Sequence, residues 1–163
     1  MKDSNFEKLL NKNVKNVSNI LNCKFKNNLL NPKFYYSEFE NERSYFGYKY
    51  NFISLTINNN EINSITINLN KLINKDFFNS FIKVYGKPNE IRVLKKENII
   101  NTVNEKDNNS FNQKLKQSII ETEEGSFDDK PLYILWEKDH YIIKLFQRYD
   151  RGYSDITFMK KIY

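Results

Sequence analysis

The chain lacks most of the residues from which enzyme motifs and covalent cross-links are built. It has one cysteine, Cys23, which excludes an internal disulfide and a cysteine-cluster zinc site. Its four glycines stand apart from one another, so no local glycine-rich loop can hold a phosphate group. His140 is the only histidine, and no Gly-x-Ser-x-Gly nucleophile motif occurs. We therefore expect no catalytic residue, no cofactor and no metal site, and predict that the protein is not an enzyme.

Long apolar segments are also missing. No run of eighteen apolar residues occurs, so the sequence predicts no membrane span. Residues 1–4 lack the apolar core of a signal peptide. The chain is accordingly expected to be cytoplasmic, or to belong to the periplasm or cell envelope if a signal peptide has been removed.

The residues that are present suffice for a folded core. Apolar residues make up 39% of the 163 positions and aromatic residues 15%, so Phe, Tyr and Ile can bury a large area. We expect one globular domain over residues 1–163, with possible subunits 4–70 and 71–163 and a polar insertion at 96–130. Asparagine occurs 26 times and alanine never. Because Asn codons are AT-rich and Ala codons GC-rich, we attribute this bias to an AT-rich genome.

The net charge of +6 is unevenly distributed along the chain. Residues 1–100 carry 16 basic and 9 acidic side chains, whereas residues 101–163 carry 10 and 11. The lysines of the first part are spread out and form no dense stripe with aromatic positions between them. Nucleic-acid binding through the basic N-terminal half is therefore an alternative function, and the charge alone indicates only nonspecific attraction.

Two helices are predicted from apolar spacing and capping residues. Ser4 and Glu7 form a capping-box pattern ahead of apolar residues spaced by three and four, which predicts a helix ending at Asn22. The Asn-Lys-Asn triplet in its middle is expected to divide this helix in two. Asn74 is predicted to cap a second helix, whose aromatic face ends at Gly86.

Most of the remaining chain shows the residue alternation of β-strands. Strands are predicted at 34–39, 46–57, 65–69, 91–94, 132–137, 140–149 and 153–160. The apolar residues change face near Asn51, which indicates a bulge or bend. Turns are predicted at 40–43 and 58–60, and residues 110–120 within the polar insertion are expected to be helical. These elements predict an α+β protein with a mostly antiparallel sheet and helices on one face.

The two halves of the chain resemble each other. Residues 9–14 resemble residues 72–77, and residues 64–67 resemble residues 155–158. Each half is predicted to contain a helix followed by a three-stranded antiparallel meander. The fold would then consist of two tandem helix-plus-three-strand units.

This order of elements resembles the β-lactamase inhibitor protein family, which has two tandem helix-plus-sheet units. Each unit is also similar to the small outer-membrane assembly lipoproteins. The resemblance is one of pattern and covers about residues 5–95 and 131–160. The connection before the second set of strands is longer here, and the paired cysteines common in such inhibitors are missing. The resemblance implies a protein-binding sheet surface rather than an active site.

Two groups of residues are candidates for contact with a partner protein. Residues 148–153 read Arg-Tyr-Asp-Arg-Gly-Tyr at a predicted hairpin turn, and Tyr and Arg are enriched at interface hot spots. The candidates there are Arg148, Tyr149, Arg151 and Tyr153. The alternative is a local Asp–Arg pair with tyrosines beside a turn. Tyr48 and Tyr50 form a second candidate, an aromatic ladder with Phe52, for which the alternative is one face of the core.

Cys23 and His140 each allow a functional and a structural interpretation. Lys24 and Lys26 beside Cys23 can make its thiol nucleophilic, but a lone cysteine at a helix end is more often a small core residue. His140 could form an acid–base pair with a neighbouring carboxylate, but its position fits a polar turn between strands. We expect the structural interpretation for both residues.

These observations favour a non-catalytic protein-binding module similar to inhibitors or immunity proteins. It is expected to cover its partner, another protein, with a sheet face and hairpin tips. The alternatives are a nucleic-acid-binding module and a processed accessory domain of the cell envelope. Nucleic-acid binding would weaken steeply with salt, because contacts to phosphates release counterions.

Overall fold

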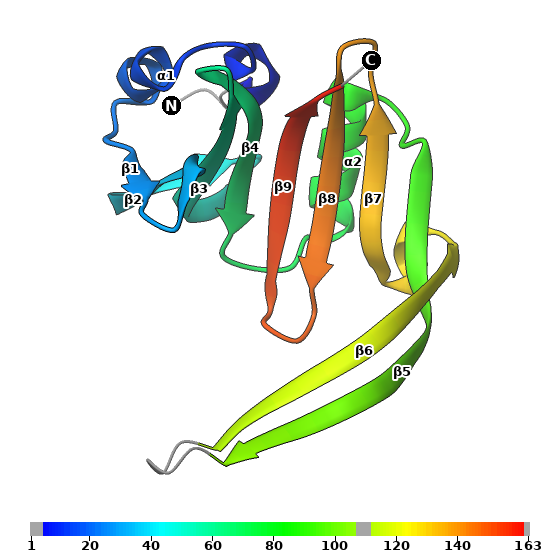
Figure 1. The fold of residues 1–163 in the computed structure, drawn as a ribbon. Coiled ribbons are helices and arrows are strands. Elements are labelled where there is room, and N and C mark those ends of the chain that lie inside the picture. Colours follow the sequence, from blue (N-terminus) through cyan, green and yellow to red (C-terminus); the bar gives the residue numbers. More distant parts are fainter. Residues whose placement is uncertain (1–4, 107–111, 162–163) are drawn as a thin grey trace. The chain divides into compact units, whose positions relative to one another are not determined.

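The chain forms an α+β protein with an antiparallel sheet, as the sequence predicts; it has two α-helices and nine strands (Figure 1). The structure is a computed structural model that describes residues 5–106 and 112–161, with side chains described for 5–95 and 120–161. The chain divides into two compact units. One unit comprises Met1–Glu90 and Tyr133–Tyr163, and the other comprises Ile91–Leu132.

The N-terminal helical segment is divided in two, as predicted. Its parts are the 3-10 helix η1 (Phe6–Leu9) and the α-helix α1 (Val14–Leu21). Between them Asn11 has a φ of 63°, and the Asn13 side chain caps α1 by accepting a 2.8 Å hydrogen bond from the Asn16 amide. Asn22 ends α1 in the left-handed conformation, with a φ of 46°. The capping box predicted at Ser4 lies outside the described residues.

Four strands follow α1. They are β1 (Lys26–Asn28), β2 (Asn31–Tyr45), β3 (Tyr48–Asn58) and β4 (Glu61–Leu69). The two tight turns of the β2–β3–β4 meander contain residues with positive φ, Phe46 with Gly47 and Asn59 with Asn60. Such pairs match the right-handed twist of the strands that they connect. The turn predicted at residues 58–60 is therefore confirmed, and β1 is a strand that the sequence pattern did not predict.

The strand register of this meander bears on two predictions, the turn at residues 40–43 and the irregularity near Asn51. The turn predicted at residues 40–43 is wrong, because β2 continues through it while its register against β3 shifts between Glu38 and Arg43. Such a shift accommodates extra residues without ending the strand. The irregularity predicted near Asn51 is confirmed, since the register of β3 against β4 shifts between Tyr50 and Phe52.

The second helix, α2 (Lys75–Tyr85), has the predicted cap and the predicted end. The Asn74 side chain accepts a 3.0 Å hydrogen bond from the Phe77 amide, and Gly86 follows the helix with a φ of 77°. The aromatic side of α2 packs on the sheet. Phe81 is 0% exposed, and its ring centroid lies 4.9 Å from that of Trp136. Aromatic packing thus holds α2 against one face of the sheet.

A second meander occupies the C-terminal part of the chain. Its strands are β7 (Pro131–Glu137), β8 (Tyr141–Arg148) and β9 (Tyr153–Lys160), all three as predicted. β9 pairs antiparallel with β4, and Thr66 lies directly opposite Thr157. These threonines occupy equivalent positions in the similar segments 64–67 and 155–158. The last strand of the first meander, β4, therefore pairs with the last strand of the second meander, β9.

The second compact unit contains a long hairpin. Its elements are β5 (Glu90–Lys106), β6 (Asn112–Glu124) and the 3-10 helix η2 (Phe127–Asp129). β5 and β6 pair antiparallel, so the helix predicted at 110–120 is wrong for residues 112–120. Residues 110 and 111 lie outside the described residues. Strand pairing here overrides the weak local preference of a polar sequence.

The hydrogen-bonding order of the nine strands is β1-β2-β3-β4-β9-β8-β7-β5-β6. The two meanders are therefore neighbours in the sheet, with β4 beside β9. Among the described residues, no helix is long and apolar enough to cross a membrane.

Candidate protein-binding surface

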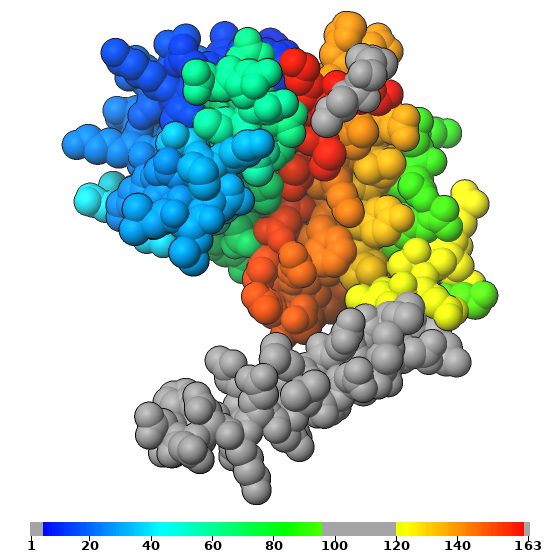
Figure 2. Space-filling model, viewed as in Figure 1, coloured from blue at the N-terminus to red at the C-terminus, as the bar shows by residue number. Residues whose placement is uncertain are grey.

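The two faces of strands β3, β4, β9, β8 and β7 differ in burial. On one face the aliphatic and aromatic side chains pack against the helices with almost no exposure, and their sequence neighbours point the other way. No helix in the described part of the chain covers this second face, and its part formed by β9, β8 and β7 is turned toward the viewer in Figures 1 and 2. We call it the open face. Its residues are Ser54, Thr56, Ser64, Thr66, Asn68, Tyr133, Leu135, Ile142, Lys144, Phe146, Asp155, Thr157 and Met159.

Hydroxyl groups run across the middle of the open face. The Oγ1 atoms of Thr66 and Thr157 lie 2.9 Å apart, and Thr56 Oγ1 lies 2.6 Å from Ser64 Oγ. The strand register places Ser54 beside Thr66 on the neighbouring strand. Each hydroxyl has one donor and two acceptor positions, so groups that bond each other keep acceptor capacity for a partner.

Aromatic rings lie on both sides of this hydroxyl row. On β2 and β3, the Tyr36 ring stacks between Phe34 at 6.5 Å and Phe52 at 6.2 Å. On β7 and β8, Lys144 Nζ lies 4.9 Å from the centroid of the Tyr133 ring. These rings are half-buried, so each offers apolar contact area at the surface.

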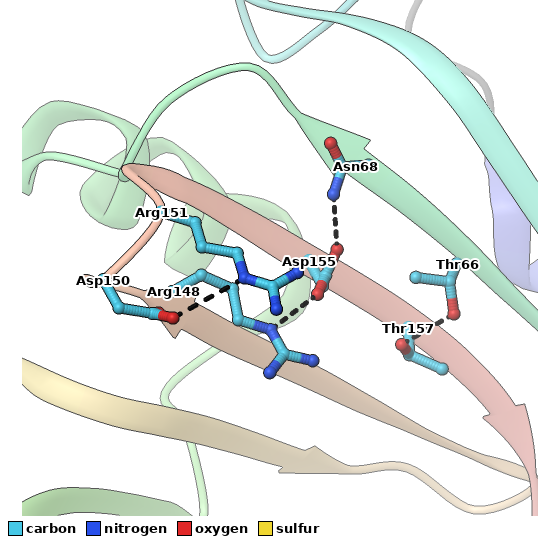
Figure 3. Close-up of polar contacts among 7 residues, drawn as sticks. All are labelled: Thr66, Asn68, Arg148, Asp150, Arg151, Asp155 and Thr157. Carbon is cyan, nitrogen blue, oxygen red and sulfur yellow. Dashed lines mark hydrogen bonds and ion pairs between the residues drawn. The ribbon is translucent and has the colours of Figure 1, made fainter. Parts of the chain in front are cut away.

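Asp155 on β9 connects the open face to the β8–β9 turn. Its Oδ1 atom accepts a 2.8 Å hydrogen bond from Asn68 Nδ2 on β4, and its Oδ2 atom lies 3.3 Å from Arg148 Nε on β8. Figure 3 shows Asn68 and Arg148 reaching the Asp155 carboxylate from the neighbouring strands. The Arg148 guanidinium also lies 4.5 Å from the centroid of the Phe146 ring. These contacts orient Arg148, although its side chain remains 44% exposed.

The β8–β9 turn comprises residues 149–152. The Arg148 carbonyl accepts hydrogen bonds from the Arg151 amide at 3.1 Å and the Gly152 amide at 2.7 Å. Gly152 has a φ of 73°, a conformation in which a side chain is strained, so glycine fits this position. The backbone of the turn is thus held by its own hydrogen bonds.

The structure brings the four predicted contact residues of this hairpin together. We call them the tip residues: Arg148, Tyr149, Arg151 and Tyr153. All are exposed except Tyr153, which is half-buried. The Tyr149 hydroxyl accepts a 2.9 Å hydrogen bond from Gln147 Nε2. Partial burial raises the pKa of the Tyr149 phenol, while the bond from Gln147 acts in the opposite direction, so the phenol is neutral at physiological pH.

Arg151 forms the local ion pair that the sequence allowed as an alternative interpretation. Its Nε atom lies 3.6 Å from Asp150 Oδ2, and both side chains are at least two-thirds exposed (Figure 3). Exposed pairs of this kind contribute little to stability. The pair therefore leaves Arg151 able to exchange Asp150 for a carboxylate of a partner at small cost.

Tyr48 and Tyr50 lie in the core, which corrects their prediction as contact residues. They are only 7% and 4% exposed. The Tyr48 hydroxyl accepts a 3.1 Å hydrogen bond from the Asn74 amide, and the Phe6 ring packs edge-on against Tyr50 at 6.3 Å. The irregular register near Asn51 explains their burial, because it places both tyrosines on the core face together with the apolar residues that follow.

His140 lies in the turn between β7 and β8 and is exposed. The nearby Glu137 carboxylate lies 3.5 Å from Lys161 Nζ, and the His140 carbonyl accepts a hydrogen bond from the Lys161 amide. Within the described residues, no group of three or more His, Cys, Asp or Glu side chains could hold a metal ion. These contacts are those of a polar turn beside an ion pair.

Cys23 is half-buried directly after α1, and we predict that its thiol reacts slowly. Burial raises the pKa of the Cys23 thiol, and this effect exceeds the opposing effects of the Ser37 hydrogen bond and the Arg43 charge. Less thiolate, the nucleophilic form, is then present at a pH of about 8. Iodoacetamide should alkylate the native protein more slowly than the protein unfolded in urea. Equal rates in the two states would contradict this prediction.

Comparison with known proteins does not identify a family for this chain. The chain matches no protein-family model, no curated protein and no solved structure. The resemblance to β-lactamase inhibitor proteins therefore rests on the order of helices and strands. The α+β fold with its antiparallel sheet is the part of that resemblance that the structure shows.

Most residues of the open face are not among the contact residues that the sequence predicts. Asn68 and Asp155 are 87 residues apart in the chain, and their contact depends on the pairing of β4 with β9. The alternation of polar and apolar residues along β4 was the local signal for this face. It indicated which side chains point away from the core, but not which strand lies beside them.

Proposed function

We propose that this protein binds another protein without catalysis and blocks it by covering part of its surface, as inhibitors and immunity proteins do. The observation that carries this proposal is the open face, which continues through the Asp155 contacts to the tip residues. Both meanders contribute strands to it. A sheet surface held by hydrogen bonds loses little conformational freedom on binding, which favours affinity.

The chemistry of the open face suits a protein partner. Its aromatic and aliphatic side chains offer apolar contact area, and its hydroxyl and carboxamide groups offer hydrogen bonds. Its cations are already in contact with other groups: Arg148 is paired with Asp155, and Lys144 lies against the Tyr133 ring. The ion pair offsets the charge of Arg148, so these residues offer little unpaired positive charge to a phosphate backbone, which favours a protein over a nucleic acid.

Tyr149 and Arg151 are suited to anchor the partner. Tyr149 is 42% exposed, so part of its ring can still be buried on binding. Arg151 can give up its exposed pair with Asp150 for a charged hydrogen bond to the partner. Steric occlusion then requires a stable complex and no chemical step.

We predict that the tip residues dominate the affinity for the partner. A partner is first isolated on the immobilised protein from nuclease-treated lysate, identified by mass spectrometry and purified. Titration calorimetry then compares Tyr149→Ala and Arg151→Ala with the unchanged chain. Each substitution should weaken binding about thirtyfold or more, the effect of losing an interface hot spot.

Matched variants separate the contact from unrelated effects. Tyr149→Phe keeps the ring and removes only the hydroxyl, so it should retain most of the affinity. Lys49→Ala removes another exposed cation that is paired with a carboxylate, Glu42, at 2.7 Å, and should leave binding unchanged. Unchanged affinity in both Tyr149→Ala and Arg151→Ala would contradict the assignment of the tip. Retention of nucleic acid alone, with release by moderate salt, would overturn the proposed function.

A further inference from the structure

A second exposed hairpin carries two leucines that the proposed function does not use. Leu29 and Leu30 lie between β1 and β2 and are 99% and 97% exposed. The Asn28 side chain accepts hydrogen bonds from the Leu30 amide at 2.9 Å and the Asn31 amide at 3.2 Å. This local bonding orders the turn. The two leucines are therefore held outward on a defined hairpin, which we call the Leu–Leu turn.

The sequence segment that contains the Leu–Leu turn is basic, while Glu38, Glu40 and Glu42 on β2 line a pocket together with Lys24 and Lys26. Residues 8–37 contain six lysines and neither aspartate nor glutamate. Three of these lysines, Lys24, Lys26 and Lys33, flank the turn and are exposed. Two exposed leucines between lysines combine an apolar point with positive charge, and this combination suits a surface that is anionic outside and apolar beneath.

We propose that the Leu–Leu turn docks this protein reversibly on an anionic phospholipid surface. Leu29 and Leu30 enter the boundary between headgroups and acyl chains, and the flanking lysines contact lipid phosphates. Lysine is suited to this position because its alkyl stem packs on apolar surface while its ammonium stays among the headgroups. The docking needs no membrane-spanning segment.

An anionic lipid surface can interact with both features of the turn, the exposed leucines and the flanking lysines. A nucleic acid would contact the lysines but gives the leucines no apolar environment. An apolar pocket of a protein would take the leucines but has no need of three cations around them. A protruding turn can also enter a fluid bilayer without a matching cavity. The combination of charge and exposed leucines therefore favours lipid.

The Leu–Leu turn is separate from the tip residues. The strand register places Phe34, near the start of β2, in line with Thr56 and Ser64, and then with Met159 near the end of β9. The β8–β9 turn precedes Tyr153, at the start of β9. The two turns thus lie at opposite ends of the strand register, and lipid docking can be tested independently of partner binding.

The test measures sedimentation of the full chain with vesicles of phosphatidylcholine, alone or with about one third phosphatidylserine. The unchanged chain should sediment with the anionic vesicles and not with the neutral ones. Salt near 1 M should release it, because the Debye length falls to about 3 Å. The double variant Leu29→Asn/Leu30→Asn should lower the partition coefficient at least about tenfold.

Charge variants test the lysines. The triple variant Lys24→Gln/Lys26→Gln/Lys33→Gln should lower the partition coefficient about a hundredfold, since each lysine near the surface contributes about fivefold. The matched control Lys83→Gln/Lys87→Gln/Lys160→Gln makes the same change in net charge at exposed lysines elsewhere and should have a much smaller effect. For the leucines the control is Val84→Asn, since Val84 is 60% exposed on α2.

Circular dichroism of each variant verifies that the fold is intact. No sedimentation of the unchanged chain with anionic vesicles would overturn the proposal. It would also be overturned by unchanged binding of the leucine variant, or by equal losses in the two lysine triples. Capture of a purified protein that depends on Leu29 and Leu30, without vesicle binding, would assign the turn to a protein partner instead.

Discussion

Replacing Phe81 with alanine is expected to lower the free energy of unfolding by about 3–5 kcal/mol. Phe81 is 0% exposed and packs between side chains of both meanders. Its ring centroid lies 5.4 Å from that of Phe46, in the β2–β3 turn, and 4.9 Å from that of Trp136 on β7. Truncation removes contacts to both meanders and leaves a cavity that close-packed neighbours can fill only in part.

Urea unfolding measures this effect through the fluorescence of Trp136, the only tryptophan in the chain. A loss of this size is a large share of the 5–15 kcal/mol typical of a domain. Val84→Ala provides the control on the same helix, because Val84 is 60% exposed, and should change stability by less than about 0.5 kcal/mol. Equal stability of the two variants would mean that α2 does not hold the meanders together.

Elements that depend on local chemistry could be predicted from the sequence. Asn74 and Gly86 bracket α2 with a capping side chain and a positive φ, and both effects involve residues within one turn of the helix. The strands of the second meander show apolar alternation and end at turns. Gly152 in one of these turns has the backbone conformation that its residue type favours. Such signals need no knowledge of distant contacts.

Elements that depend on strand pairing could not be predicted in this way. Residues 40–43 are polar and suggest a turn, but pairing with β3 on both sides of the shift keeps them in β2. Residues 112–120 are extended because β6 pairs with β5. Ile20 follows Val17 by three residues, the apolar spacing of the predicted first helix, yet it is 53% exposed. In each case tertiary structure overrides the local pattern.

The residues of the candidate surface also differ in whether local sequence or strand pairing brings them together. The tip residues are neighbours in the sequence, so a hairpin turn is enough to bring them together. The contact of Asn68 with Asp155 requires the register of β4 against β9. The burial of Tyr48 and Tyr50 follows from the bulge that the sequence did predict, but which face becomes the core depends on where the helices pack. The open face therefore could be identified only from the pairing of the strands, and not from the local sequence.

The pairing of β4 with β9 leads to a second prediction of large effect, at Thr157. β9 is an interior strand, and Thr157 lies between Thr66 on β4 and Lys144 on β8. Thr157→Pro removes a backbone donor from this strand and introduces a ring that the ladder cannot accommodate. We expect a loss of about 3 kcal/mol or more in the free energy of unfolding. Urea unfolding followed by circular dichroism measures it.

Thr157→Val is the matched control, because it keeps the branched shape and removes only the hydroxyl. Its partner, the Thr66 hydroxyl, is half-buried, so water can replace the 2.9 Å contact and the cost should stay near 1 kcal/mol. If Thr157→Pro instead left Trp136 fluorescence and its unfolding midpoint unchanged, β9 would not contribute to the stability of the sheet, and the prediction would be contradicted. The open face takes strands from both meanders, so it forms only when β4 and β9 are paired. Thr157→Pro should therefore abolish partner binding together with the fold, whereas Thr157→Val should keep both.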